Sequence, residues 1–464
     1  MSNSNGGGKK LSAFDATMLV IGGIIGVGIF FTPQSVASYV PDTTVFVLLW
    51  VLGAGVAFCG AMTFAEWGGS LPNSGGWFVF LRESFGPFAA FLFAWVELGV
   101  VTAGSIAVIA SIGAENISGV GSPGEGTHLA VSAAFIVVLT GLTICGIKIS
   151  ATVQNVCTIT KLVAILALIV AGVLFFTPVP ESQLVAPTPL ATDTNLFAGA
   201  IAASLPVLFA IGGWQHLCYI APQVRDPQRV IPKAILLGVA CVGTVYVLVN
   251  YSYVRVMGID GLGDTPGFAG VVAERTLGEG MARALTGAIA ISAFGVCAVN
   301  IIVAPGIYVA MARAGLFFKS FGRVHPRTGA PVLALLTQGA LSLVYLSWMY
   351  VSSQESTAPG AGDDSFRMNL PTLTESVVFA EWVFHGLVAL GLILIRRRRP
   401  DLPRPFKSFL WPMAPVIYLA VACLVVFGNL YQAKPVITLV GLGVLGVGAA
   451  VYWPWRKYMR SVSK

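Results

Sequence analysis

The chain has 464 residues, of which 56% are hydrophobic and only 10% are charged, and its mean hydropathy is +0.83. Soluble globular proteins carry about 25% charged residues. The composition therefore excludes an ordinary soluble domain and predicts an all-α polytopic membrane protein embedded in a lipid bilayer. The net charge of +7 would suit a nucleic-acid partner, but the positions of the basic residues favour another explanation.

Apolar stretches of about 20 residues, the length of a helix that crosses a bilayer, recur along the chain. They alternate with loops rich in charge, proline and glycine, and this pattern predicts twelve transmembrane helices. The predicted spans are 14–39, 44–69, 86–112, 129–147, 154–178, 196–221, 230–257, 284–313, 331–352, 373–395, 408–430 and 435–455.

The basic residues predict the orientation of these spans. With an even number of spans both termini lie on one side, and 21 of the 27 Lys and Arg residues then fall in segments on that side, against 5 on the other. Lys and Arg accumulate in cytoplasmic loops. We therefore expect a multi-pass protein of the cell (inner) membrane with both termini in the cytoplasm, and no nucleic-acid partner.

The spans predict two halves and an appendage. Residues 14–178 and 196–395 each hold five helices of similar length, and each half opens with a helix that contains a glycine cluster. This is the pattern of an inverted repeat. Residues 408–455 form two further helices, and 1–13 and 456–464 are short cytoplasmic tails.

Catalytic and metal-binding signals are weak. The seven cysteines form no CxxC pair and the four histidines are scattered, so we expect no metal, cofactor or disulfide framework. Neither HExxH nor GxSxG occurs, and we expect no enzyme.

The glycine clusters interrupt the first and sixth helices, at Gly26 and Gly28 and at Gly212 and Gly213. Within a bilayer a helix break is tolerated only beside protein or a wet cavity. Two breaks in corresponding helices of an inverted repeat indicate the substrate site of a transporter. The alternative is that these glycines are small residues for helix packing.

A break exposes N–H groups, which suit a carboxylate, and carbonyl groups, which suit an ammonium. We therefore predict that the N–H groups of residues 26–28 hold the carboxylate of an α-amino acid. Carbonyls near Ile24, Phe209 and Ile211 would hold its amine. The substrate-binding residues predicted at the breaks are Ile24, Ile25, Gly26, Val27, Gly28, Phe209, Ala210, Ile211, Gly212 and Trp214.

Several ordered motifs resemble those of the amino acid–polyamine–organocation (APC) superfamily, and of its L-type amino acid transporter branch in particular. They lie at 21–33, 65–76, 81–87, 209–214, 225–235 and 399–407. The resemblance implies a five-plus-five inverted repeat of leucine-transporter type, with helices 1 and 6 broken and with alternating access. Val27 departs from the pattern, since many relatives have Ser or Ala there.

Lys161 lies well inside the predicted span 154–178, whereas Lys233, Arg255 and Arg313 lie near the ends of their spans. A lysine at mid-bilayer should face the protein interior. It matches the fifth-helix lysine of the resemblance, whose ammonium stands where sodium-coupled relatives bind an ion. The implied role is a tether from helix one to helix eight that makes sodium unnecessary. A proton carrier and a purely structural lysine are the alternatives.

Further candidates lie outside the breaks. Phe209 and Trp214 could close over a substrate as aromatic gates or simply pack. The resemblance suggests that Tyr253 lines the inner cavity, and Asn300 is a possible polar contact. Glu97 and Glu381 could serve a cationic substrate, but neither adjoins a break in sequence, which favours neutral substrates.

The sequence thus predicts a secondary transporter of L-amino acids, with neutral substrates and sodium-independent exchange as the first choice. Proton-coupled uptake and an antiporter of cationic amino acids or polyamines are the alternatives. Eukaryotic members of the branch bond to a heavy chain through a cysteine after helix three, and residues 113–128 contain none. We therefore expect no disulfide-linked heavy chain, and a monomer or weak homo-oligomer.

Overall fold

The computed structural model describes residues 10–118, 125–175, 196–265, 267–356, 370–431 and 435–462. Within these ranges the regular structure is helical. The helices of the first half are α1 (Ala13–Ile24), η1 (Gly28–Phe30), α2 (Thr32–Tyr39), α3 (Thr43–Ser70), α4 (Trp77–Phe85), α5 (Pro87–Val96), η2 (Glu97–Val101), α6 (Thr102–Ser118), α7 (Glu125–Cys145), α8 (Ile147–Val170) and η3 (Ala171–Phe175).

The later helices begin after the second gap in the described residues. They are α9 (Leu196–Ala210), η5 (Trp214–Gln223), α10 (Pro227–Met257), α11 (Ile259–Asp264), α12 (Phe268–Leu277), α13 (Glu279–Val303), α14 (Pro305–Arg313), η6 (Lys319–Gly322), α15 (Val332–Ser356), α16 (Leu370–Arg398), α17 (Met413–Tyr431) and α18 (Pro435–Val462).

Eight helical segments of the described chain are long and apolar enough to cross a membrane, which confirms a polytopic α-helical membrane protein. α1 and the described part of α17 are shorter apolar helices. Residues 176–195 and 357–369 lie outside the described residues, and they include most of the predicted loops 179–195 and 353–372 and the end of the predicted span 154–178. The total of twelve spans and the division into two repeats stay predictions.

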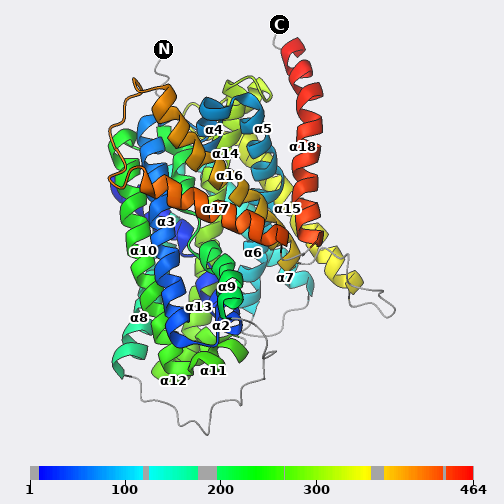
Figure 1. Cartoon of the computed structure of the whole chain (residues 1–464). Coiled ribbons are helices and arrows are strands. Elements are labelled where there is room, and N and C mark those ends of the chain that lie inside the picture. The colour runs from blue at the N-terminus through cyan, green and yellow to red at the C-terminus, as the bar shows by residue number, and fades with distance from the viewer. Residues whose placement is uncertain are drawn as a thin grey trace.

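Most of the long helices run along the bundle, whereas α17 crosses it obliquely (Figure 1). In Figure 1, α4 lies at the top, whereas α11 and α12 lie at the bottom. The predicted orientation makes the top the cytoplasmic end. α3 and α10 pack along one another, and α13 packs against α6 and α8 in the interior.

The predicted first helix, 14–39, is broken near its middle into α1, η1 and α2, as the glycines predict. The helix begins with a capping box in which Ser12 and Asp15 satisfy each other's backbone N–H groups, a strong start signal. Its helical hydrogen bonds end at Ile25, and η1 then starts at Gly28. α9 ends at Ala210 and η5 starts at Trp214, so the second glycine cluster also separates two helical segments.

Buried ion pairs fasten the end of the bundle that the sequence assigns to the cytoplasm. Glu66 of α3 is fully buried and accepts a hydrogen bond from Arg396 Nε at 2.6 Å and one from the backbone N–H of Ser408 at 2.9 Å. Arg404 lies 3.7 Å from the same carboxylate. A buried charge of this kind is tolerable only when it is paired. Glu66 thus links α3 to α16 and to the loop before α17.

A second buried carboxylate holds the start of α1. Asp15 forms an ion pair with Lys148 and accepts a hydrogen bond from Asn155 at 2.9 Å, and both partners belong to α8. The backbone of Leu11 pairs with the end of η5 and the residues that follow it, because its N–H donates to the carbonyl of Gln223 and its carbonyl accepts from the N–H of Arg225. These contacts fix the first half of the broken helix against both of its neighbours.

Candidate functional site

The two helix breaks touch each other through backbone atoms. Gly213 has φ +105°, a left-handed conformation that disfavours a side chain. A Cβ atom on Gly213 would lie 2.4 Å from the carbonyl oxygen of Gly23, and one on Gly23 would lie 3.3 Å from the carbonyl oxygen of Gly213. Glycine at both positions therefore lets the breaks meet without intervening side chains.

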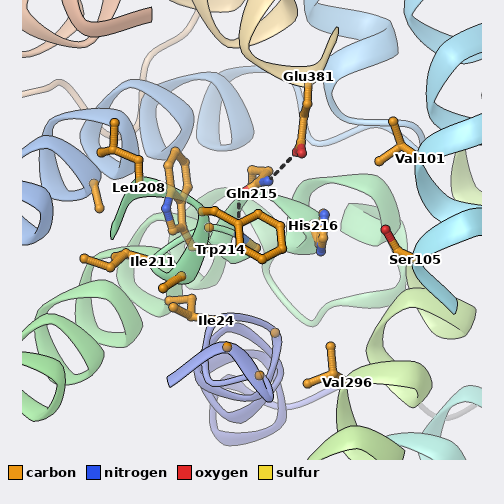
Figure 2. A pocket seen from close by; sticks show the side chains of 18 of the residues that line it. Ile24, Val101, Ser105, Leu208, Ile211, Trp214, Gln215, His216, Val296 and Glu381 are labelled. Carbon is orange, nitrogen blue, oxygen red and sulfur yellow. Dashed lines mark hydrogen bonds between the residues drawn. The ribbon is translucent and has the colours of Figure 1, made fainter. Parts of the chain in front are cut away.

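A cavity of about 180 Å³ lies beside this contact. The first break contributes Gly26, Val27 and Gly28 to its wall, and the second contributes residues 209–214. The rest of the wall comes from α1, α3, η2, α6, α9, η5, α13, α16 and α17. Figure 2 shows Ile24, Val101, Ser105, His216 and Val296 around it.

Most predicted site residues line this cavity. They are Ile24, Gly26, Val27, Gly28, Phe209, Ala210, Ile211, Gly212, Trp214 and Asn300. Ile25, Lys161 and Tyr253 are not among the lining residues. Ile25 is fully buried, and its carbonyl accepts a hydrogen bond from Lys161.

Tyr253 is buried beside Phe268 of α12, with 4.9 Å between the ring centroids. The tyrosine that contacts the first break is Tyr246, seven residues or about two helical turns earlier on α10. Its hydroxyl donates to the carbonyl of Ile24 at 3.1 Å. Sequence reasoning missed Tyr246 because both tyrosines lie on the same face of the helix.

The first break leaves backbone donors beside the cavity. Within the described chain, the N–H groups of Val27 and Gly28 have no hydrogen-bond partner. The Tyr246 hydroxyl lies against the N–H of Gly26. Free N–H groups at the start of a helical segment attract anions. The wall at Val27 and Gly28 can therefore bind a carboxylate.

Lys161 braces the other end of the same break. Its side chain is fully buried, and its ammonium donates to the carbonyl of Gly22 at 2.9 Å and to the carbonyl of Ile25. These are carbonyls that α1 leaves without helical partners as it ends. Lys161 thus connects α8 to the last turn of α1 and does not face the cavity.

Two acidic residues, which the sequence offered only as candidates for contact with a cationic substrate, form a polar part of the wall. Glu97 and Glu381 both line the cavity and are close enough to interact electrostatically. Glu97 accepts a hydrogen bond from Thr102 at 3.2 Å and faces the Tyr219 hydroxyl at 3.5 Å. Among the described lining residues there is no Lys or Arg.

The position of Glu97 follows from a π-helical turn. Residues 97–101 form η2, a π-helix inserted in the otherwise α-helical run from Pro87 to Ser118. Such insertions are frequent at functional sites. η2 directs Glu97 and Val101 to the central cavity, whereas Leu98, Gly99 and Val100 line a separate apolar cavity. No sequence signal for this insertion is apparent.

Glu381 is joined to the second break through Gln215. The backbone N–H of Gly213 donates to Gln215 Oε1 at 3.0 Å, and Gln215 Nε2 donates to Glu381 Oε1 at 3.1 Å. Figure 2 shows Glu381 reaching from α16 toward Gln215. His385, one turn further along α16, has its Nε2 3.7 Å from Glu381 Oε1.

The two aromatic residues of the second break differ in their surroundings. Trp214 is 2% exposed and packs against Phe64 and Tyr418, with centroid distances of 5.1 and 6.0 Å. Phe209 is 48% exposed and lines the same cavity. Trp214 is therefore a fixed part of the wall, and Phe209 is the aromatic side chain with room to move.

Residues 11–448 match the family model described as "Amino acid permease". The chain is 28% identical to the rat "Large neutral amino acids transporter small subunit 2", over 97% of this chain and 82% of the rat protein. It is 29% identical to the human "b(0,+)-type amino acid transporter 1", over 86% of this chain and 78% of that protein.

A third relative is the human "Cystine/glutamate transporter", which is 28% identical over 96% of this chain and 85% of its own length. The names of these relatives confirm the expectation of an amino acid transporter in place of an enzyme. They also agree with the resemblance to the L-type branch. This protein belongs to the amino acid permease family of the APC superfamily.

Proposed function

We propose that the protein is a secondary active transporter that exchanges neutral L-amino acids across the cell (inner) membrane by alternating access, without sodium. The observation that supports this best is the meeting of two broken helices beside one cavity, with the N–H groups of Val27 and Gly28 unpaired within the described chain. Such a site binds the carboxylate and amine common to all α-amino acids.

The contacts of Lys161 support sodium independence. Its ammonium is covalently part of the chain and donates hydrogen bonds to the carbonyls of Gly22 and Ile25. The end of α1 therefore needs no bound ion. Valine and leucine side chains at 27, 56, 101, 208 and 296 make much of the cavity wall apolar, which suits an uncharged side chain.

A second candidate, a transporter of cationic amino acids or diamines, is favoured by one observation. Glu97 and Glu381 lie in the cavity wall, without Lys or Arg among the described lining residues. A carboxylate pair would attract an ammonium at the end of a substrate side chain. Glu97 and Glu381 lie far from the breaks along the chain, which favoured neutral substrates, but in the fold both line the same cavity as the breaks.

Orientation and assembly complete the proposal. The excess of Lys and Arg in one set of loops supports cytoplasmic termini. The absence of cysteine from residues 113–128 supports transport without a disulfide-linked heavy chain, as a monomer or weak homo-oligomer.

Uptake into proteoliposomes tests these points. Labelled leucine, lysine and putrescine are compared in vesicles that are empty or loaded with unlabelled amino acid, with and without sodium. Exchange of neutral substrates predicts leucine uptake only into loaded vesicles, with no effect of sodium. Leucine uptake into empty vesicles driven by a pH gradient would contradict exchange, and preferential uptake of lysine or putrescine would support the second candidate.

A further inference from the structure

The hydrogen bonds between Gly213, Gln215 and Glu381 form a continuous chain, which we call the relay. It runs from the backbone of the second break to a carboxylate on α16, with steps of 3.0 and 3.1 Å. We propose that Glu381 is a proton-binding positioning residue, and that its protonation releases the Gly213 N–H to the substrate carboxylate. The proposal rests on the proposed function only in taking an L-amino acid as the substrate.

The relay has a defined direction. A backbone N–H only donates, so the amide oxygen of Gln215 must face Gly213 and its NH₂ group must face Glu381. An ionised carboxylate accepts this bond about twice as strongly as a neutral acid does. Ionised Glu381 therefore holds the Gln215 oxygen on the Gly213 N–H, and protonated Glu381 holds it less firmly.

The Gly213 N–H lies where it can bind substrate once it is released from Gln215. Gly213, Gln215 and Glu381 all line the cavity, and Gly213 directly precedes the first residue of η5. An N–H at the start of a helical segment carries partial positive charge. A substrate carboxylate bound at the N–H groups of Val27 and Gly28 would gain a further donor from Gly213 across the same cavity, and it competes for this donor with the oxygen of Gln215.

Other titratable groups face Glu381 and bear on its proton. These groups come from the elements packed around it: Glu97 of η2, His216 and Tyr219 of η5, His385 of α16 itself and Tyr418 of α17. Glu97 disfavours a second negative charge, whereas a protonated histidine would favour it. Among these titratable groups, only Glu381 is hydrogen-bonded to Gln215. The availability of the Gly213 N–H therefore depends on whether Glu381 is protonated.

The sign of the coupling follows. If protonation frees the donor, proton and substrate bind more tightly together than apart, and each raises the affinity for the other. Substrate affinity should therefore rise as the pH falls. The difference between a charge-assisted and a neutral hydrogen bond corresponds to a change of about fivefold in affinity.

Equilibrium binding of labelled leucine to the purified protein in nanodiscs, between about pH 4 and about pH 8, a range that includes the ordinary titration of a glutamate, tests this. The wild type should bind about fivefold more tightly at the acidic end. Glu381→Gln, which mimics the neutral acid, should bind tightly at every pH. Gln215→Met removes the relay without altering Glu381 and should also lose the pH dependence, which keeps the test valid if Glu381→Gln fails to fold.

Three matched variants separate the relay from its neighbours. Glu97→Gln, His216→Gln and His385→Gln should move the midpoint of the pH dependence of leucine affinity, but the affinity should still depend on pH. The proposal is overturned if Glu381→Gln keeps the wild-type profile, or if one of these three variants abolishes it instead. If no amino acid binds to the wild type at any pH, the proposed function fails first, and this outcome is distinct from pH-independent binding.

Discussion

Replacing Lys161 by methionine tests how the first break is held. The substitution keeps most of the side-chain volume and removes the ammonium that donates hydrogen bonds to the carbonyls of Gly22 and Ile25. Leaving a buried acceptor unpaired costs about 1–3 kcal/mol, so two acceptors destabilise this geometry of α1 by about 2–6 kcal/mol. Even the lower value corresponds to a loss of about 30-fold in the population of the competent state.

The assay is exchange of labelled leucine in loaded proteoliposomes, with equal amounts of reconstituted protein confirmed by gel filtration. We expect Lys161→Met to reduce the initial rate by at least about 30-fold. Thr160→Ala is the matched control, because the Thr160 hydroxyl donates to the carbonyl of Val156 within the same helix. An unchanged rate in a well-folded Lys161→Met protein would refute the reasoning.

Two further predictions concern other contacts. Gly213→Ala should abolish exchange, because the added Cβ would lie 2.4 Å from the carbonyl oxygen of Gly23 at a φ of +105°; transport at the wild-type rate would contradict the described meeting of the breaks. Glu66→Gln should lower stability by about 3–5 kcal/mol, since removing one partner leaves buried arginine charge uncompensated. Thermal unfolding measured by intrinsic fluorescence should show a clear fall in the midpoint, and an unchanged midpoint would count against the paired role of Glu66.

The membrane class and the positions of both breaks could be predicted from the sequence, because they depend on local composition. Long apolar segments require helices, and glycine clusters within them mark the places where a helix can end. For the same reason the residues next to the clusters, such as Val27 and Phe209, were found to line the cavity.

The polar part of the site could not be predicted in the same way. Glu381 reaches Gln215 across 166 residues of sequence, and no local pattern encodes that distance. Glu97 faces the cavity through a π-helical turn that shifts the register of its helix. Tyr246 and Tyr253 share a helix face, so sequence periodicity cannot decide which of them lies at the depth of the break.

The buried ammonium of Lys161 has a consequence for the energy that can drive transport. A cation that is covalently part of α8 cannot be carried into either solution, so no sodium gradient can perform work at that position. The free energy for movement against a gradient must then enter through groups that do exchange with the solutions. In the cavity these are the amino acid itself and the titratable side chains around Glu381.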